Sequence, residues 1–320
     1  MNLSGPYFTV YTAFQKDGDI DYKSISNYIN YLIRNGADKL YLMPYNGRYS
    51  QLSMDEILSL NRFVIKESKV ANKETLVIVS DPIHCSTADS IKFAVDAKKN
   101  GADLFSSICR EKFYSNEQII SHYEKLGDAN IPIFIHNMPF LSATDSQIIH
   151  WPIDLVYNLS KLDHVFAMKE DTKDINYAKK LMELPIEAKL IFAGRKSYLL
   201  ELIDLNIDGY LNGISMINPA ISHHFWELYK NKKIKDLSDF VKKVDDPFWD
   251  VLVKRLGWHR CNKASLEYFK IMKRNERLPM ICLSDDEFTY VSDFWDKHVN
   301  EINKCIKFVL YQQEANQKDS

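Results

Sequence analysis

The chain has 320 residues, of which 46% are hydrophobic and 26% are charged, so it can bury a large core. Its 41 basic and 43 acidic residues leave a net charge of −2, which excludes a global field that would attract nucleic acid or an anionic membrane. The five cysteines include no C-x-x-C pair, which indicates reduced thiols. The sequence has no apolar stretch of about 20 residues and no basic segment followed by an apolar one at its N-terminus. We therefore expect a cytoplasmic protein without a membrane partner.

Short runs of β-branched and aromatic residues alternate with longer segments whose apolar residues recur at helical spacing. This alternation is typical of βαβ units on a parallel sheet. The predicted strands are residues 7–11, 39–43, 75–80, 104–107, 131–136, 165–169, 189–193 and 209–212. The predicted helices are residues 22–34, 54–67, 88–99, 116–126, 153–160, 175–182, 197–205 and 220–229. These pairs predict an α/β fold, a (β/α)8 TIM barrel, over residues 1–230.

The last quarter of the chain has helical spacing only, in residues 232–243, 247–255, 263–274 and 285–312. We expect a C-terminal helical appendage over residues 231–312, packed on the barrel, and a flexible tail at residues 313–320. Residues 257–260 and Pro279 are expected to interrupt its helices. The aromatic residues of this segment, Trp249 and Trp258 among them, are expected to supply packing or a subunit interface.

Active sites of such barrels lie at the carboxyl ends of the strands, where one residue of this chain stands out. Lys169 ends an otherwise apolar run, residues 165–168. Burial favours the neutral form of an amine and lowers its pKa, as a Schiff-base lysine needs in order to attack a carbonyl. The alternative is a lysine that forms a salt bridge with Glu170 or Asp171.

Three stretches resemble the dihydrodipicolinate synthase and N-acetylneuraminate lyase family. They are Thr12-Ala13-Phe14 with residues 17–21, then Phe134-Ile135-His136-Asn137-Met138-Pro139, similar to the Tyr-Asn-x-Pro strand, and Phe166-Ala167-Met168-Lys169-Glu170, similar to the Gly-x-Lys strand. The resemblance covers residues 5–230 and implies that Lys169 is a covalent nucleophile that forms an imine with pyruvate or a related 2-oxo acid. The protonated imine is the electron sink for making or breaking a carbon–carbon bond, so no metal or other cofactor is expected. The resemblance also implies a homo-oligomer, either a dimer or a tetramer.

The chain departs from the family pattern on two strands. His136 stands where the family has tyrosine. Imidazole can also transfer protons near neutral pH, and the alternative is a histidine that is only hydrogen-bonded at a strand end. Residues 44–48 replace the Gly-Thr-Thr-Gly-Glu loop that holds the substrate carboxylate. Here Tyr45, Asn46 and Gly47 are candidates for substrate binding, the last two through backbone amides, whereas Arg48 could equally form a surface salt bridge.

Further candidates follow the seventh and eighth strands. Arg195 could bind a carboxylate or phosphate on the distal part of the substrate, with an ion pair to a loop acid as the alternative. Asn212 and Gly213 could contact the substrate. Elsewhere, Cys109-Arg110-Glu111 stands in place of the family's tyrosine pair, and Pro139-Phe140-Leu141-Ser142 resembles the Pro-x-Leu-Ser of the sialic acid lyases.

These features predict a carbon–carbon lyase or aldolase that acts on pyruvate or a related 2-oxo acid and resembles N-acetylneuraminate lyase. Two alternatives stay open. One is a synthase or dehydratase, similar to dihydrodipicolinate synthase, that uses the same imine. The other is a barrel that binds a 2-oxo acid or sugar acid without turnover, which the altered loop and the missing tyrosines favour.

Overall fold

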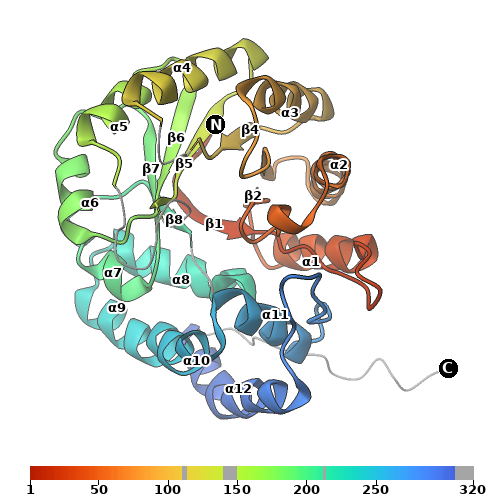
Figure 1. Cartoon of the computed structure of the whole chain (residues 1–320). Coiled ribbons are helices and arrows are strands. Elements are labelled where there is room, and N and C mark those ends of the chain that lie inside the picture. Colours follow the sequence, from red (N-terminus) through yellow and green to blue (C-terminus); the bar gives the residue numbers. More distant parts are fainter. Residues whose placement is uncertain (110–113, 140–149, 212–213, 307–320) are drawn as a thin grey trace.

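Eight parallel strands close into a barrel surrounded by helices (Figure 1). The computed structural model describes residues 1–109, 114–139, 150–211 and 214–306. The strands are β1 (Gly5–Thr9), β2 (Lys39–Tyr41), β3 (Leu76–Ser80), β4 (Leu104–Ser107), β5 (Ile133–Asn137), β6 (Val165–Glu170), β7 (Lys189–Ala193) and β8 (Gly209–Leu211). They pair in chain order, and β8 closes the barrel on β1. The predicted (β/α)8 barrel with C-terminal helices is confirmed.

The helices of the barrel alternate with its strands. They are α1 (Tyr22–Arg34), α2 (Met54–Ala71), α3 (Thr87–Asn100), α4 (Asn116–Leu126), α5 (Ile153–Ser160), α6 (Ile175–Met182), α7 (Lys196–Leu200) and α8 (Pro219–Lys230), with short 3-10 turns η1 (Tyr49–Gln51), η2 (Gly127–Ala129), η4 (Ile203–Leu205) and η5 (Ile214–Met216). Hydrogen bonds from capping side chains determine where several of these helices begin. Ser53 and Glu56 accept each other's backbone N–H at the start of α2, so two donors that the helix leaves open are satisfied.

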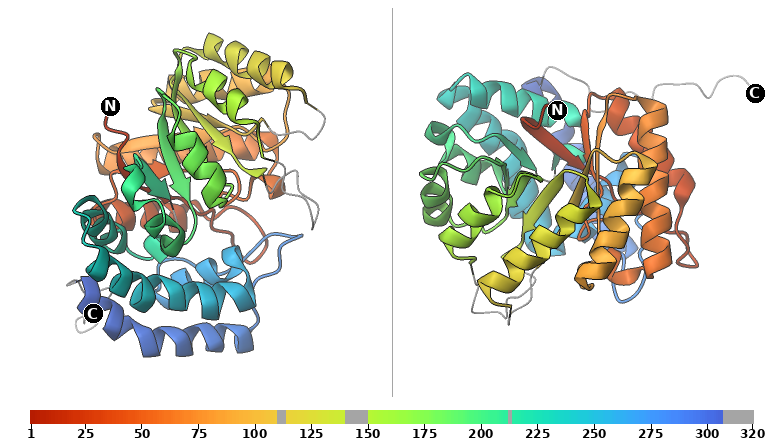
Figure 2. Two further views of the ribbon diagram at one scale, coloured as in Figure 1. Left: turned by 90° about the vertical axis from the view of Figure 1, so that its left-hand side faces the viewer. Right: turned by 90° about the horizontal axis from the view of Figure 1, so that it is seen from above.

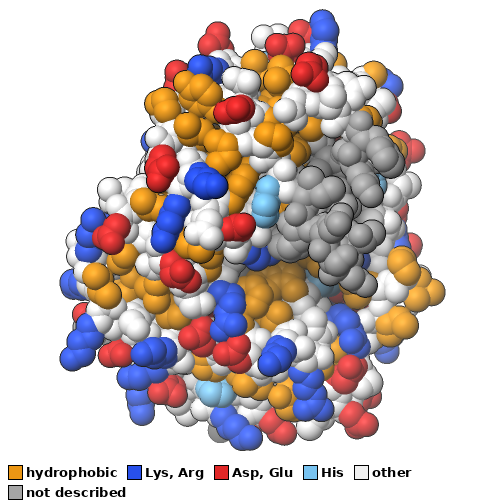
Figure 3. Space-filling view, turned by 60° about the vertical axis from the view of Figure 1, so that its left-hand side comes forward, with side chains coloured by type: hydrophobic (Ala, Val, Ile, Leu, Met, Phe, Trp, Pro, Cys, Tyr) orange, Lys and Arg blue, Asp and Glu red, His pale blue; other side chains and the backbone are white. Residues whose placement is uncertain are grey.

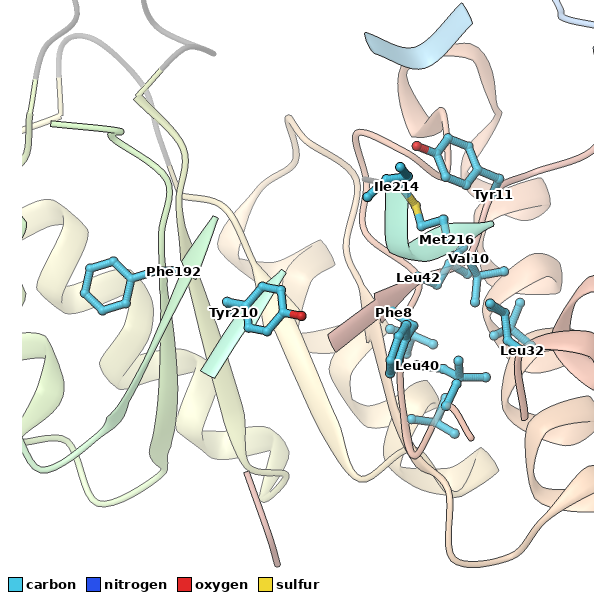
Figure 4. Close-up of a cluster of buried hydrophobic side chains, with 14 of the residues drawn as sticks. Phe8, Val10, Tyr11, Leu32, Leu40, Leu42, Phe192, Tyr210, Ile214 and Met216 are labelled. Carbon is cyan, nitrogen blue, oxygen red and sulfur yellow. The ribbon is translucent and has the colours of Figure 1, made fainter. Parts of the chain in front are cut away.

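Alternating side chains of the strands build two cores. Outward-facing Phe8 of β1 and Leu40 of β2 lie in one apolar cluster with Leu32 of α1 (Figure 4). Inward-facing residues fill the barrel, among them Phe134 and Ala167. Because side chains of a strand alternate between its two faces, residues two positions further along also point inward. This parity brings His136 of β5 and Lys169 of β6 inside the barrel, near its carboxyl end.

The C-terminal segment forms a helical layer on one side of the barrel (Figures 1 and 2). It contains α9 (Ile234–Phe240), the π-helical turns η6 (Val241–Asp245) and η7 (Phe248–Val253), α10 (Lys254–Leu256), α11 (Trp258–Tyr268) and α12 (Asp285–Ile306). The break predicted at residues 257–260 is present but shorter, because Gly257, with a φ of 81°, separates α10 from α11 and Trp258 already begins α11. None of the helices in the described part of the chain combines the length and the apolar character that a bilayer crossing requires.

A buried ion pair joins the barrel to this layer. The Lys196 amine, at the start of α7, lies 3.3 Å from Asp245 Oδ1 in η6, and both side chains are fully buried. The second oxygen of Asp245 accepts the backbone N–H of Lys196 at 2.8 Å. One carboxylate therefore satisfies two donors at the junction.

Replacing Asp245 by alanine is expected to lower the free energy of unfolding by about 3–5 kcal/mol, because the buried ammonium loses its carboxylate. Urea denaturation would measure the loss. Asp246→Ala is the matched control, since its pair with Arg195 is partly exposed and contributes at most about 1 kcal/mol. Equal losses in the two variants would contradict the assignment.

Candidate active site

Lys169 and His136 lie side by side on neighbouring strands. The register of β5 and β6 aligns these two residues, and both point into the barrel. The Lys169 Nζ lies 2.7 Å from His136 Nε2. Lys169 is 1% exposed and His136 is fully buried, so the amine is inside the protein and not in bulk water.

Asp171 is the third member of the group that Lys169 and His136 begin. Lys169 Nζ donates to Asp171 Oδ2 at 2.6 Å, and the other Asp171 oxygen lies 3.2 Å from Lys173 Nζ. Glu170, which points to the other side, accepts the Thr172 N–H at 2.6 Å and the Tyr198 hydroxyl at 3.3 Å. The salt bridge considered for Lys169 is thus present, and its partner is Asp171. Sequence reasoning named Asp171 only as a possible salt-bridge partner and gave it no catalytic or binding role, although its spacing of two from Lys169 indicates the same face of the extended chain.

The same amine also borders a cavity of about 450 Å³. Its described lining is Met43, Tyr45, Asn46, Met138, Lys169, Asp171, Lys173, Ala193, Gly194, Leu211, Trp249 and Trp258. Figure 3 shows hydrophobic side chains gathered in a hollow of the molecular surface beside the grey residues. Lys169 is therefore paired with a carboxylate and still faces a space large enough for a small molecule.

Burial and charge act together on the three groups. Burial lowers the pKa of the Lys169 amine, and the Asp171 carboxylate opposes this shift. Burial, with the neighbouring Lys169 charge, lowers the pKa of His136 to about 4, so its ring is neutral near pH 7. Burial alone would raise the pKa of Asp171, but the Lys169 and Lys173 ammonium groups outweigh it and hold that pKa well below its usual range. The site therefore holds a carboxylate and a neutral imidazole around one amine.

A hydrogen-bonded chain continues from His136 into the barrel. His136 Nδ1 lies 3.2 Å from the Tyr41 hydroxyl, which lies 2.7 Å from Ser106 Oγ. The contacts with Lys169, Tyr41 and Ser106 are all satisfied if Lys169 donates to Nε2, Nδ1–H donates to Tyr41, and Tyr41 donates to Ser106, while Nε2 also lies 3.5 Å from Asp171 Oδ2. In this arrangement Nε2 is the basic nitrogen, and it faces the amine.

Comparison with known proteins shows the family to which the chain belongs. The model of the dihydrodipicolinate synthetase family matches residues 2–297. The chain belongs to this family. It is 25% identical to the 4-hydroxy-tetrahydrodipicolinate synthase of Methanothermobacter thermautotrophicus over 228 residues, covering 69% of this chain and 77% of that protein. It is also 25% identical to the Hydrogenobaculum sp. enzyme of that name over 294 residues, 87% of this chain and 92% of the relative.

Solved structures show the same fold. The N-acetylneuraminate lyase from Fusobacterium nucleatum superposes with a TM-score of 0.82 at 18% identity, covering 93% of this chain and 99% of the lyase. The dihydrodipicolinate synthase from Bacteroides thetaiotaomicron has the same score and identity, covering 92% and 98%. Members of the family are lyases and synthases of the class I aldolase type.

Residues 44–48, which replace the family's carboxylate loop, form a compact turn. The Gly47 N–H donates to the Met43 carbonyl at 2.7 Å, so this amide already has a partner inside the turn. A Cβ on Gly47 would lie 2.8 Å from the Tyr49 ring and 2.9 Å from that carbonyl. There is no room for a side chain at this position, which is a structural reason for the glycine. Tyr45 and Asn46 line the cavity, whereas Gly47 is not among its described lining residues.

The two arginine candidates have partners of their own. Arg195 pairs with Asp246 and Asp250 at 2.8 Å each, which is the ion-pair alternative considered for it. Arg48 is buried, donates to Gln51 at 3.2 Å and lies 5.8 Å from the centre of the Tyr45 ring. Neither guanidinium is part of the described cavity lining. The candidates Asn212 and Gly213 lie outside the described residues.

Two tryptophans of the C-terminal helices line the cavity with the barrel residues. Trp249 and Trp258 pack on each other, as expected, and in addition they border the cavity, which the sequence did not indicate. Trp258 also donates its Nε1–H to Asn46 Oδ1 at 3.3 Å, which joins α11 to the turn after β2. No local pattern could have placed them, because their helices reach the cavity only through the way they dock on the barrel.

Proposed function

We propose that this chain is a carbon–carbon lyase or aldolase in which Lys169 forms an imine with the ketone of pyruvate or a related 2-oxo acid. The observation that carries the proposal is a buried amine beside a cavity, 2.7 Å from an imidazole nitrogen and 2.6 Å from a carboxylate oxygen. Burial favours the neutral, nucleophilic form of such an amine. Family membership supports the same assignment.

In the proposed reaction, His136 moves the protons. The neutral Lys169 amine attacks the ketone carbon, and the carbonyl oxygen leaves as water after two protonations. The His136 Nε2 is close enough to accept a proton from the amine and to return it, as general acid–base catalysis requires. The Tyr41 hydroxyl, on the far side of the ring, can accept the Nδ1–H of the tautomer that leaves Nε2 basic.

Asp171 has an electrostatic part in this proposal. The iminium keeps the positive charge on Nζ, and the Asp171 oxygen 2.6 Å away stabilises that charge. The cation then withdraws electrons from the neighbouring carbon, so that an enamine forms and a carbon–carbon bond can be made or broken. Tyr45 and Asn46, which line the cavity, are the proposed contacts for the rest of the substrate.

A synthase that uses the same imine is the second candidate. The curated relatives named 4-hydroxy-tetrahydrodipicolinate synthase favour it, at 25% identity. Both candidates require the Lys169 imine, and they differ in the direction of the reaction and in the second substrate. Product analysis with pyruvate and a panel of aldehydes would separate them.

Trapping of the imine tests the proposal directly. The purified protein is incubated with pyruvate, reduced with borohydride, digested and analysed by mass spectrometry. The reduced pyruvate mass is expected on the peptide that contains Lys169, whereas the peptide of the equally buried Lys196 stays unmodified as an internal control. No adduct with pyruvate, 2-oxobutyrate or 2-oxoglutarate, or a mass on another lysine, would refute the proposal.

The role of Asp171 predicts a shift in pH dependence. The carboxylate raises the pKa of Lys169 against the lowering effect of burial. In Asp171→Asn this opposition is lost, so the Lys169 pKa falls further and more of the amine is neutral at a given pH. The trapping rate, which falls as the amine becomes protonated at low pH, is therefore expected to fall at a lower pH in this variant than in the wild type. Asp163 is exposed, so Asp163→Asn should leave the pH dependence of trapping unchanged. If the trapping rate of Asp171→Asn falls at the wild-type pH or at a higher one, the electrostatic role of Asp171 is disproved.

A further inference from the structure

We propose that the cavity accepts, as the second reactant, an aldehyde with a flat apolar body such as an aromatic ring, and that Trp249 and Trp258 bind this body. The inference rests on the proposed imine at Lys169 and adds the class of the carbonyl partner. It separates the chain from enzymes whose second reactant is a polyhydroxylated sugar aldehyde.

The two tryptophans form a rigid aromatic wall. Their rings stack with centroids 4.7 Å apart and an interplanar angle of 22°. Phe248 packs against the Trp258 ring edge-on at 6.5 Å, and the Arg195 guanidinium lies 5.9 Å from the centre of the Trp249 ring. Since Asp246 and Asp250 hold Arg195 by ion pairs, Arg195 is a positioning residue for this wall. A fixed aromatic surface of this kind favours stacking of another flat ring.

The rest of the described lining is mostly apolar. It adds the side chains of Met43, Met138, Ala193 and Leu211. Apolar surface of this kind gains free energy from contact with an apolar ligand.

Several polar groups of the described lining are engaged with the protein, whereas the indole N–H of Trp249 is buried without a hydrogen-bond partner among the described residues. The Asn46 Nδ2 donates to Thr9 at 3.0 Å, and its Oδ1 accepts the Trp258 indole N–H. The charged groups of Lys169, Asp171 and Lys173 are bonded to one another. Hydroxyl groups of a polyol that lie against Met43, Met138 and Leu211 would have no hydrogen-bond partner there, which costs free energy, whereas an aromatic ring has no such requirement.

The cavity has room for both reactants. At about 450 Å³ it is far larger than pyruvate needs, and it borders both the Lys169 amine and the tryptophan pair. The methyl carbon of the pyruvate enamine would attack the aldehyde carbon, and the aldehyde oxygen would take up a proton. Water then hydrolyses the iminium, which restores the Lys169 amine and releases a 4-hydroxy-2-oxo acid with the ring on its fourth carbon. The reaction is redox-neutral, and its reverse is the lyase direction.

Wild-type turnover with two kinds of aldehyde tests the inference. The full chain is incubated with pyruvate and either benzaldehyde or D-erythrose, and products are followed by mass spectrometry. We expect kcat/KM for benzaldehyde to exceed that for erythrose by at least about tenfold. A preference for erythrose, or no product from benzaldehyde although the Lys169 adduct forms, overturns the inference and leaves the imine standing. Absence of the adduct itself overturns both.

Variants of the wall provide the second measurement. Trp249→Leu is expected to lower kcat/KM for benzaldehyde about tenfold, chiefly through KM, while borohydride trapping of pyruvate at Lys169 is unchanged. Trp258→Phe keeps an aromatic ring and should lose less. Trp226→Leu is the matched control, because Trp226 lies near Gly5 at the opposite end of the barrel. Equal effects of the Trp249 and Trp226 changes on benzaldehyde turnover would refute the role of the wall.

Discussion

Lys169→Arg is expected to yield no borohydride-trapped pyruvate and to lower kcat/KM by at least about 10³-fold, because the variant has no nucleophile that can form an imine. Arginine keeps a positive charge for Asp171, so the buried carboxylate stays paired. A guanidinium does not become neutral in a protein and cannot attack the ketone. The loss therefore reports on chemistry and not on a broken ion pair.

The controls for this variant separate folding from reactivity. Thermal unfolding of Lys169→Arg should resemble that of the wild type, whereas Lys169→Met, which leaves Asp171 without its closest cation, should unfold at lower temperature. Pyruvate that is still trapped in Lys169→Arg would mean that another lysine is the nucleophile. In that case the short contacts of Lys169 would have only a structural meaning.

His136→Gln is expected to lower kcat by about 10²–10⁴-fold, the usual range for loss of a general acid–base group. Glutamine can hydrogen-bond to Lys169 but cannot exchange a proton near neutral pH. The pyruvate adduct should still form, more slowly, because the nucleophile remains. Stopped borohydride trapping at short times and steady-state turnover would measure the two effects.

Tyr41→Phe is the companion to this variant. It removes the hydroxyl that faces His136 Nδ1 but leaves Nε2 beside the amine, so a smaller loss of kcat is expected than for His136→Gln.

With a pKa of about 4, His136 stays neutral well below pH 7, and its function as a base should fail only as the pH falls toward that value. A change of less than tenfold in His136→Gln would rule out a proton-transfer role.

Local sequence patterns were sufficient for the barrel and for the centre of the site. Strand-length apolar runs and helical spacing predicted the alternation of elements, and α1, α4, α5 and α6 have the predicted bounds. The period of two along a strand also predicts that Lys169 shares the inward face with Ala167, and that His136 shares it with Phe134. Such patterns work because neighbours in the chain decide which face of an element is buried.

Contacts between distant segments had to come from the tertiary structure. Arg195 pairs with Asp246 and Asp250 instead of reaching the cavity, and Trp249 and Trp258 reach it from helices that showed no link to the site in sequence. These placements depend on how the C-terminal layer docks on the barrel. Docking is set by the summed packing of many side chains, and no spacing along the chain records it. The sequence by itself thus determined the barrel and the place of Lys169 at the end of its sixth strand, while the tertiary structure decided what surrounds that lysine.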